Sequence, residues 1–125
     1  MVSNWKIKER TILSIMELSK SAMPNEFSGL LVGDPDSKVI NDIYIIPATV
    51  NGPASSTIRQ DLVPLSFSIV GSVHSHPQQS SLPSSADMRF FQSKYINIIS
   101  HFPFNKYDFS AYNSKGQNIA LEIIP

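Results

Sequence analysis

The segment Val73-His74-Ser75-His76-Pro77 carries two histidines one residue apart at the end of an apolar run. The run before it predicts a strand, and Pro77 ends this strand because proline has no N–H to donate to a sheet. Side chains of a strand alternate between its two faces, so His74 and His76 project from one face and Ser75 from the other. This alternation makes the two imidazoles neighbours, and it excludes Ser75 as a nucleophile activated by either histidine.

Asp87 supplies a carboxylate ten residues after Pro77, where an apolar, helix-compatible segment begins. Two histidines and one carboxylate form a ligand set that zinc uses in hydrolases, with one position left for water. Simpler interpretations also exist. Two histidines on a strand are compatible with ordinary hydrogen-bonded residues, and Ser84-x-x-Asp87 has the form of a helix capping box, with aspartate in place of the usual glutamate. The interpretations are compatible, because a helix N-terminus would hold Asp87 rigidly near the histidines.

The composition predicts one globular domain over residues 1–125, because 42% hydrophobic and 16% charged residues can build a core. Ten basic and ten acidic residues balance without a run of like charge, which argues against nucleic acid or a membrane surface as partner. The chain has no cysteine, so any metal must be held by His, Asp or Glu. The N-terminal residues lack the apolar run of a signal peptide and no segment is long enough to span a bilayer, so we expect a cytoplasmic protein.

The rest of the chain predicts a mixed α+β fold in which helices cover a sheet. Val70 and Ser72 are expected on the histidine face of the central strand. The third histidine, His101, has no spaced partner and is expected to be structural or exposed. Helices are predicted over residues 6–22 and 84–93, and strands over residues 26–33, 38–46, 66–76, 95–101, 107–113 and 117–124. The first two strands are expected to form a hairpin. The first helix is expected to cover the sheet with an apolar stripe, which consists of Trp5, Ile12, Met16 and Met23, widened by Ile15 and Leu18.

In combination, these features resemble the signature of the JAMM (MPN+) zinc metallopeptidase family in its small prokaryotic form. Glu26 precedes a glycine-containing strand, the pair His74 and His76 is followed by proline, and Ser84 and Asp87 are separated by two residues. Seven residues, counted from the proline after His76 to the proline before Ser84, separate the two parts of the signature. The resemblance extends from Glu26 to the C-terminal end and covers most of the chain.

The resemblance implies a mixed, curved sheet flanked by two helices, similar to the cytidine-deaminase architecture. It implies one zinc ion per chain, held by His74, His76 and Asp87, with a water completing the tetrahedron. Glu26 would hold this water, accept its proton and pass the proton to the leaving amine. Ser84 would donate a hydrogen bond to the developing oxyanion.

In the family, the bond that is cut commonly follows the C-terminal Gly-Gly of ubiquitin or a ubiquitin-like protein. Residues 47–65 and the segment after Asp87 are shorter than in eukaryotic deubiquitinases, which insert substrate-clamping loops there. The expected partner is therefore a prokaryotic ubiquitin-like or sulfur-carrier protein with a Gly-Gly tail. Two alternatives are a hydrolase that frees an amino acid from a sulfur carrier and a non-catalytic MPN scaffold, although scaffolds typically lack these ligands. The oligomeric state stays open.

Overall fold

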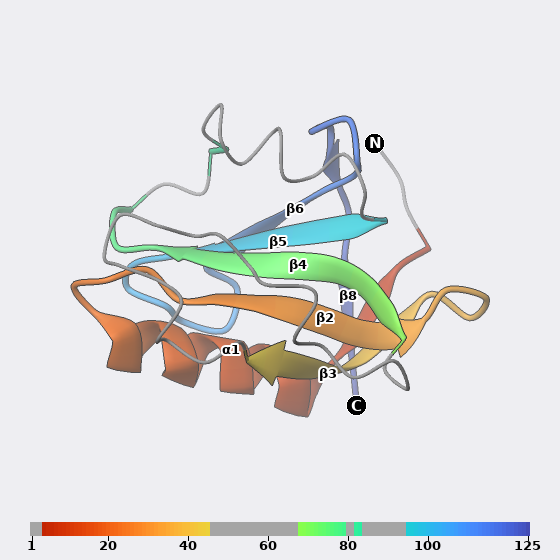
Figure 1. Ribbon diagram of the computed structural model, residues 1–125, viewed down its shortest axis with the longest axis horizontal. Coiled ribbons are helices and arrows are strands. Elements are labelled where there is room, and N and C mark those ends of the chain that lie inside the picture. The colour runs from red at the N-terminus through yellow and green to blue at the C-terminus, as the bar shows by residue number, and fades with distance from the viewer. Residues whose placement is uncertain (1–3, 46–67, 80–81, 84–94) are drawn as a thin grey trace.

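The computed structural model describes residues 4–45, 68–79, 82–83 and 95–125, which form one mixed sheet and one helix (Figure 1). The predicted α+β class is confirmed. The second predicted helix, over residues 84–93, lies outside the described residues. The described elements are β1 (Lys6–Lys8), α1 (Glu9–Ala22), β2 (Ser28–Asp34), β3 (Val39–Ile45), β4 (Ile69–His76), β5 (Ile96–His101), β6 (Phe109–Tyr112), β7 (Asn118–Ile119) and β8 (Glu122–Ile124).

The eight strands are ordered β7-β6-β5-β4-β2-β3-β1-β8, which places β4 and its histidines in the middle of the sheet. Strands β2 and β3 form the predicted antiparallel hairpin, and its turn includes a hydrogen bond from the Asp36 backbone N–H to Asp34 Oδ1 at 3.0 Å. Strand β4 pairs antiparallel with β2 and parallel with β5. The parallel pairing matters for the site because it brings the carboxyl ends of β4 and β5 to the same edge.

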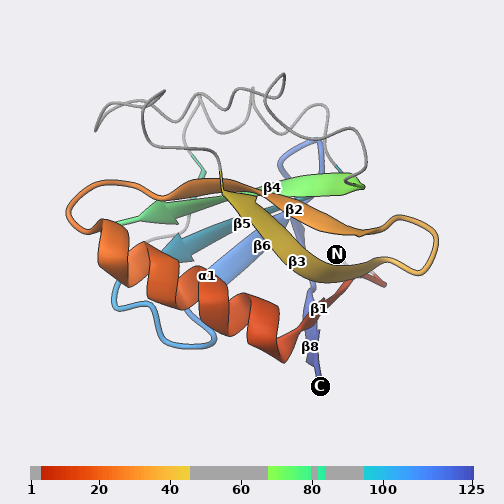
Figure 2. The same cartoon turned by 60° about the horizontal axis from the view of Figure 1, so that its bottom comes forward.

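Helix α1 covers one face of the sheet, as Figure 2 shows. Most of the apolar stripe predicted from the sequence is buried, with Ile12 and Ile15 fully inaccessible and Met16 nearly so, whereas Met23 is exposed. These side chains pack with Val73 and Ile98 of the sheet into the main hydrophobic core. The regular spacing of apolar residues on α1 therefore serves to cover the sheet.

Two predicted elements need correction. Residues 6–8, predicted as the first helical turn, form strand β1, in which Lys6 pairs with Val39 on one side and Glu122 on the other. The alternation of half-buried lysines around the buried Ile7 is the period of a strand, and pairing on both sides overrides the helical propensity.

The single strand predicted over residues 117–124 is in fact two short strands at opposite edges of the sheet. β7 pairs with β6, and β8 pairs with β1. Only residues 120 and 121 separate β7 from β8, so the two edges come within about 11 Å of each other, since consecutive Cα atoms are about 3.8 Å apart. The sheet is therefore strongly curled. Among the described residues, no helix has the length and apolarity needed to cross a membrane.

Candidate metal centre

His74 and His76 lie at the carboxyl end of β4, between β2 and β5. His74 is buried, with 1% of its surface exposed, and His76 is half-buried. The residues paired with His74 are Ser28 on β2 and Ile99 on β5. The alternation predicted from the sequence holds here, so both imidazoles belong to the face of the sheet that α1 does not cover.

Ser75 belongs to the opposite side of the strand and is fully buried. Its Oγ accepts a hydrogen bond from the backbone N–H of Phe27 at 2.6 Å, and its own N–H donates to the Phe27 carbonyl at 2.8 Å. This side chain therefore fixes the entrance of β2 against the end of β4. The predicted placement of Ser75 on the face opposite the histidines is confirmed, because its hydroxyl is bonded to Phe27.

Glu26 lies one residue before this contact. The β2–β4 ladder ends at the pair Ser28 and His74, and one residue further the Ser75 N–H still donates to the Phe27 carbonyl. Glu26 lies two residues before Ser28, at the entrance of β2. Residues two apart in an extended segment share a face, so an extended backbone here would set Glu26 on the face of Ser28 and His74. The glutamate is exposed, which keeps its carboxylate in contact with water.

The histidine face also buries a polar pair next to the site. Ser72, two residues before His74, donates a hydrogen bond to Asn97 Oδ1 on β5 at 2.5 Å, and both residues are inaccessible to solvent. Sequence reasoning placed Ser72 on this face correctly but did not single out Asn97. The register that brings Asn97 beside Ser72 is set by the parallel pairing of β4 and β5, which the sequence does not encode locally.

Val70 was predicted on the same face, and this was wrong. The β2–β4 register shifts between Leu31, which pairs with Gly71, and Val32, which pairs with Ile69, so Val70 is an extra residue in the ladder. Such a bulge breaks the alternation of faces. Val70 consequently packs in the main core together with Val73.

His101 is a residue that sequence reasoning missed. It is the last residue of β5 and pairs in parallel register with His76, the last residue of β4. Paired residues of neighbouring strands point to the same face, so a third histidine stands beside the predicted pair. His101 is half-buried, and its place beside His76 comes from strand pairing, which its spacing in the sequence did not indicate. Strands β4 and β5 both end in a histidine and end at the same level of the sheet. This indicates that the two histidines are neighbours, but only after the strand pairing is known.

The other two predicted site residues, Ser84 and Asp87, lie outside the described residues. Within the described ranges, no three His, Asp or Glu side chains come close enough together to bind a metal ion by themselves. The described part of the site thus offers two imidazoles on one strand and a carboxylate across the β2–β4 junction. Imidazole nitrogen and carboxylate oxygen suit zinc, and the absence of cysteine leaves no thiolate alternative.

Residues 8–114 match the family described as prokaryotic homologs of the JAB domain. The chain belongs to this family. A protein of Haloferax volcanii named probable metalloprotease is 40% identical over 117 residues, covering 87% of this chain and 73% of the relative. The resemblance inferred from the histidine segment is therefore confirmed.

Solved structures agree with this assignment. A JAB1/MPN domain protein from Archaeoglobus fulgidus has a TM-score of 0.77 at 30% identity, covering 96% of this chain and 99% of that protein. A structure described as JAMM, a metalloprotease-like zinc site in the proteasome and signalosome, has a TM-score of 0.73 at 30% identity, covering 98% of this chain and all of that one. A protein from Desulfitobacterium hafniense shares the fold, with a TM-score of 0.73 at 19% identity and coverage of 99% and 94%.

Proposed function

We propose that this JAB-family protein is a zinc-dependent metallopeptidase. The observation that carries the proposal is the arrangement at the end of β4, where buried His74 and half-buried His76 share one face and exposed Glu26 lies two residues before Ser28, the partner of His74. Two imidazoles on one strand face and a solvated carboxylate at the entrance of the neighbouring strand are the residue types needed for metal ligands and for a base. The H. volcanii relative is named probable metalloprotease, and the JAMM neighbour is described as a metalloprotease-like zinc site, which supports the same activity here.

His74 and His76 fit zinc by chemistry and by position, because both are imidazoles on one face of one strand. Asp87 would complete the protein ligands, as the signature of the family implies. When bound, zinc supplies the Lewis acidity that lowers the pKa of a water to about 7. The stoichiometry we propose is one ion per chain.

Glu26 would act as the general base. Its carboxylate accepts a proton from the attacking water and then donates this proton to the nitrogen of the leaving amine. The hydrogen bonds between Phe27 and Ser75 hold the backbone next to Glu26 against the end of β4. Ser84 would donate a hydrogen bond to the oxygen that becomes negatively charged in the transition state.

The substrate we propose is an amide or isopeptide bond after the Gly-Gly tail of a ubiquitin-like or sulfur-carrier protein. Such a tail is extended and has little side-chain bulk, so it can lie along strands and bond through its main chain. Release of an amino acid from a sulfur carrier is a variant of the same hydrolysis.

The test begins with metal content, measured by plasma emission on protein purified without added metal. We expect about one zinc per wild-type chain and none for His74→Ala. His101→Ala is the matched control, because it removes a histidine from the same face and should keep the metal. Absence of metal in the wild type, with no uptake on adding zinc, would contradict the proposal and favour a non-catalytic scaffold.

A further inference from the structure

His101 stands on the opposite side of His76 from Glu26. Strand β4 lies between β2 and β5, and His76 is in register with His101 on the β5 side. The proposed metal centre thus has a carboxylate on one flank and a third imidazole on the other. Both His76 and His101 are half-buried, so the edge that they share is partly exposed to solvent.

The tautomer of the His101 ring follows from its hydrogen bond. Its Nδ1 lies 3.0 Å from the carbonyl oxygen of Phe102, and a carbonyl oxygen can only accept. Nδ1 must therefore carry the proton, which leaves Nε2 of the neutral ring with a lone pair. Within the described ranges, Nε2 of His101 has no hydrogen-bond partner.

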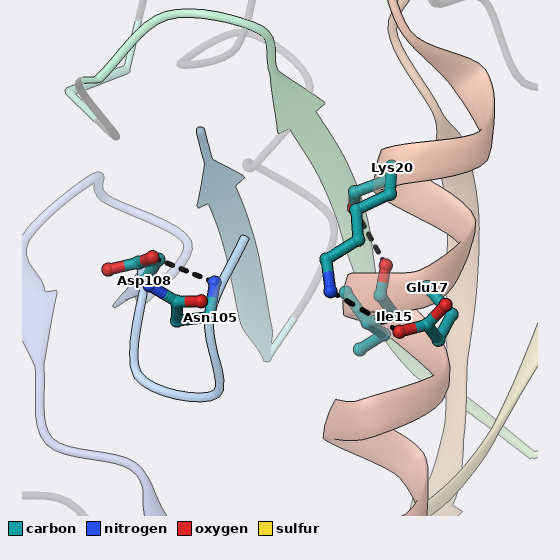
Figure 3. Close-up of polar contacts among 6 residues, drawn as sticks. Ile15, Glu17, Lys20, Asn105 and Asp108 are labelled. Atoms are coloured by element: carbon teal, nitrogen blue, oxygen red, sulfur yellow. Dashed lines mark hydrogen bonds and ion pairs between the residues drawn. The ribbon is translucent and has the colours of Figure 1, made fainter. Parts of the chain in front are cut away.

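The backbone on both sides of His101 is also held. Its N–H donates to the Asp108 carbonyl at 2.9 Å, and its carbonyl accepts from the Phe104 N–H at 2.9 Å. The turn that follows is closed by a hydrogen bond from the Asn105 N–H to Asp108 Oδ2 at 2.8 Å (Figure 3). A ring fixed in this way presents one acceptor at the edge of the sheet without further loss of conformational entropy.

The adjoining residue Phe102 joins this turn to β4. Its N–H lies 3.2 Å from the His76 carbonyl and 2.9 Å from the Gln78 carbonyl. The two strand ends are therefore tied together directly beyond the paired histidines. Backbone hydrogen bonds therefore hold the spacing between His76 and His101.

We propose that His101 is a substrate-binding residue whose Nε2 accepts a hydrogen bond from a main-chain N–H of the bound peptide. The inference rests on the proposed peptidase function and adds the chemistry of one subsite, on the β5 side of the metal centre. His101 lies on the flank away from Glu26, so it orients the peptide and takes no part in moving the reacting proton. Its loss should weaken binding more than turnover.

The test uses zinc-loaded protein and a fluorogenic peptide whose C-terminal Gly-Gly is joined by an amide bond to an aminocoumarin. For His101→Ala we expect KM to rise about three- to tenfold, the range produced by one lost neutral hydrogen bond. The kcat value and the zinc content should stay unchanged. His101→Gln should recover most of the affinity, because its amide oxygen can accept the same N–H. Lys115→Ala, in the exposed turn before β7, is the control that should behave as wild type.

An unchanged KM in His101→Ala, with an active wild type, would overturn the inference and leave the proposed function intact. Loss of zinc in His101→Ala would also overturn it, because the residue would then belong to the metal centre. If the wild type does not cleave the probe, binding of the fluorescein-labelled peptide is measured by anisotropy. Weaker binding by the variant supports the subsite, whereas equal binding, or no binding by the wild type, overturns it.

Discussion

The two faces of the sheet around β4 differ in the side chains that they bury beside the histidine segment. Towards α1 the sheet contributes Val73 and Ile98, which interdigitate with apolar residues of the helix. On the other face lie Ser72, His74 and Asn97, each no more than 1% exposed. Burial of apolar side chains stabilises the folded state, whereas burial of polar groups destabilises it unless they find hydrogen-bond partners. The face towards α1 therefore stabilises the fold, whereas the histidine face carries the proposed site.

Asn97 shows that burying polar groups on the histidine face lowers the stability of the fold. Its Oδ1 accepts from Ser72, but its buried Nδ2 has no hydrogen-bond partner among the described residues. A donor left unsatisfied in this way costs about 1–3 kcal/mol. An apolar residue at this position would avoid the cost, so stability alone does not explain the polar histidine face.

The largest effect should come from Glu26→Gln on the histidine side. The substitution keeps shape and removes the base, so we expect hydrolysis to fall by about 10²- to 10⁴-fold while zinc content and melting temperature stay near wild type. Turnover of a Gly-Gly amide probe and metal content measure the two quantities on one preparation. Activity equal to wild type would remove Glu26 from the mechanism.

A substitution on the helix-covered face should lower stability and leave zinc binding and substrate binding unchanged. Ile98→Ala removes a fully buried side chain from the core, and we expect the free energy of unfolding to fall by about 2–5 kcal/mol. Zinc stoichiometry and KM should be unchanged in the protein that remains folded. Denaturant titration followed by kinetics at low temperature tests both. A specific change in KM, with little loss of stability, would contradict the division between the two faces.

A smaller loss of stability is expected for a substitution at the contact between α1 and β5, the strand next to β4. Ser19 Oγ of α1 lies 2.9 Å from Ser100 Oγ of β5 and donates to the Ile15 carbonyl at 2.7 Å. Ser100 Oγ in turn lies 3.4 Å from the His74 carbonyl oxygen. Ser19→Ala should lower the free energy of unfolding by about 1 kcal/mol. Denaturant titration measures this loss, and a change in zinc affinity would show that α1 helps to position His74.

The smallest effect concerns the ion pair between Glu9 of α1 and Lys106 in the turn after β5. The hydrogen bond to the Glu9 carboxylate raises the pKa of Lys106 above its ordinary value of 10.5. A raised pKa in the folded state stabilises the protein below the ordinary value, and this stabilisation is lost as the pH rises through the shifted pKa. Glu9→Gln should therefore lower the melting temperature slightly at neutral pH.

The matched control for this pair is Glu17→Gln, which breaks the exposed contact with Lys20 at 3.3 Å (Figure 3). Exposed pairs of this kind contribute little, so its melting temperature should be nearer to wild type. The pH-dependent part of the Glu9→Gln effect should vanish above the shifted pKa of Lys106. A difference from wild type that does not depend on pH would show that Lys106 is not the group responsible.

The sequence predicted what depends on local periodicity. The shared face of His74 and His76, the engagement of Ser75 away from them, and the β2–β3 hairpin all follow from the alternation of residues and from turn chemistry. The bulge at Val70 escaped this reasoning, because an extra residue changes the face without changing the composition. The strand at residues 6–8 escaped it because three residues do not define a period on their own.

Pairing between distant segments could not be predicted. The position of His101 beside His76 depends on the parallel register of β4 and β5, which is a property of the assembled sheet. The same holds for the separation of residues 117–124 into two edge strands. The roles of Ser84 and Asp87 stay predictions, because these residues lie outside the described part of the chain.

The pairing of β1 with β8 has a consequence for the order of folding during synthesis. Ile7 is among the first described residues to be made, yet its partner Ile123 is among the last. A nascent chain therefore cannot complete the curled sheet until β8 has left the ribosome. Contacts that span so much of a sequence slow folding. We expect α1 and the β2–β3 hairpin to form early, while closure of the sheet around the core waits until β8 has been made.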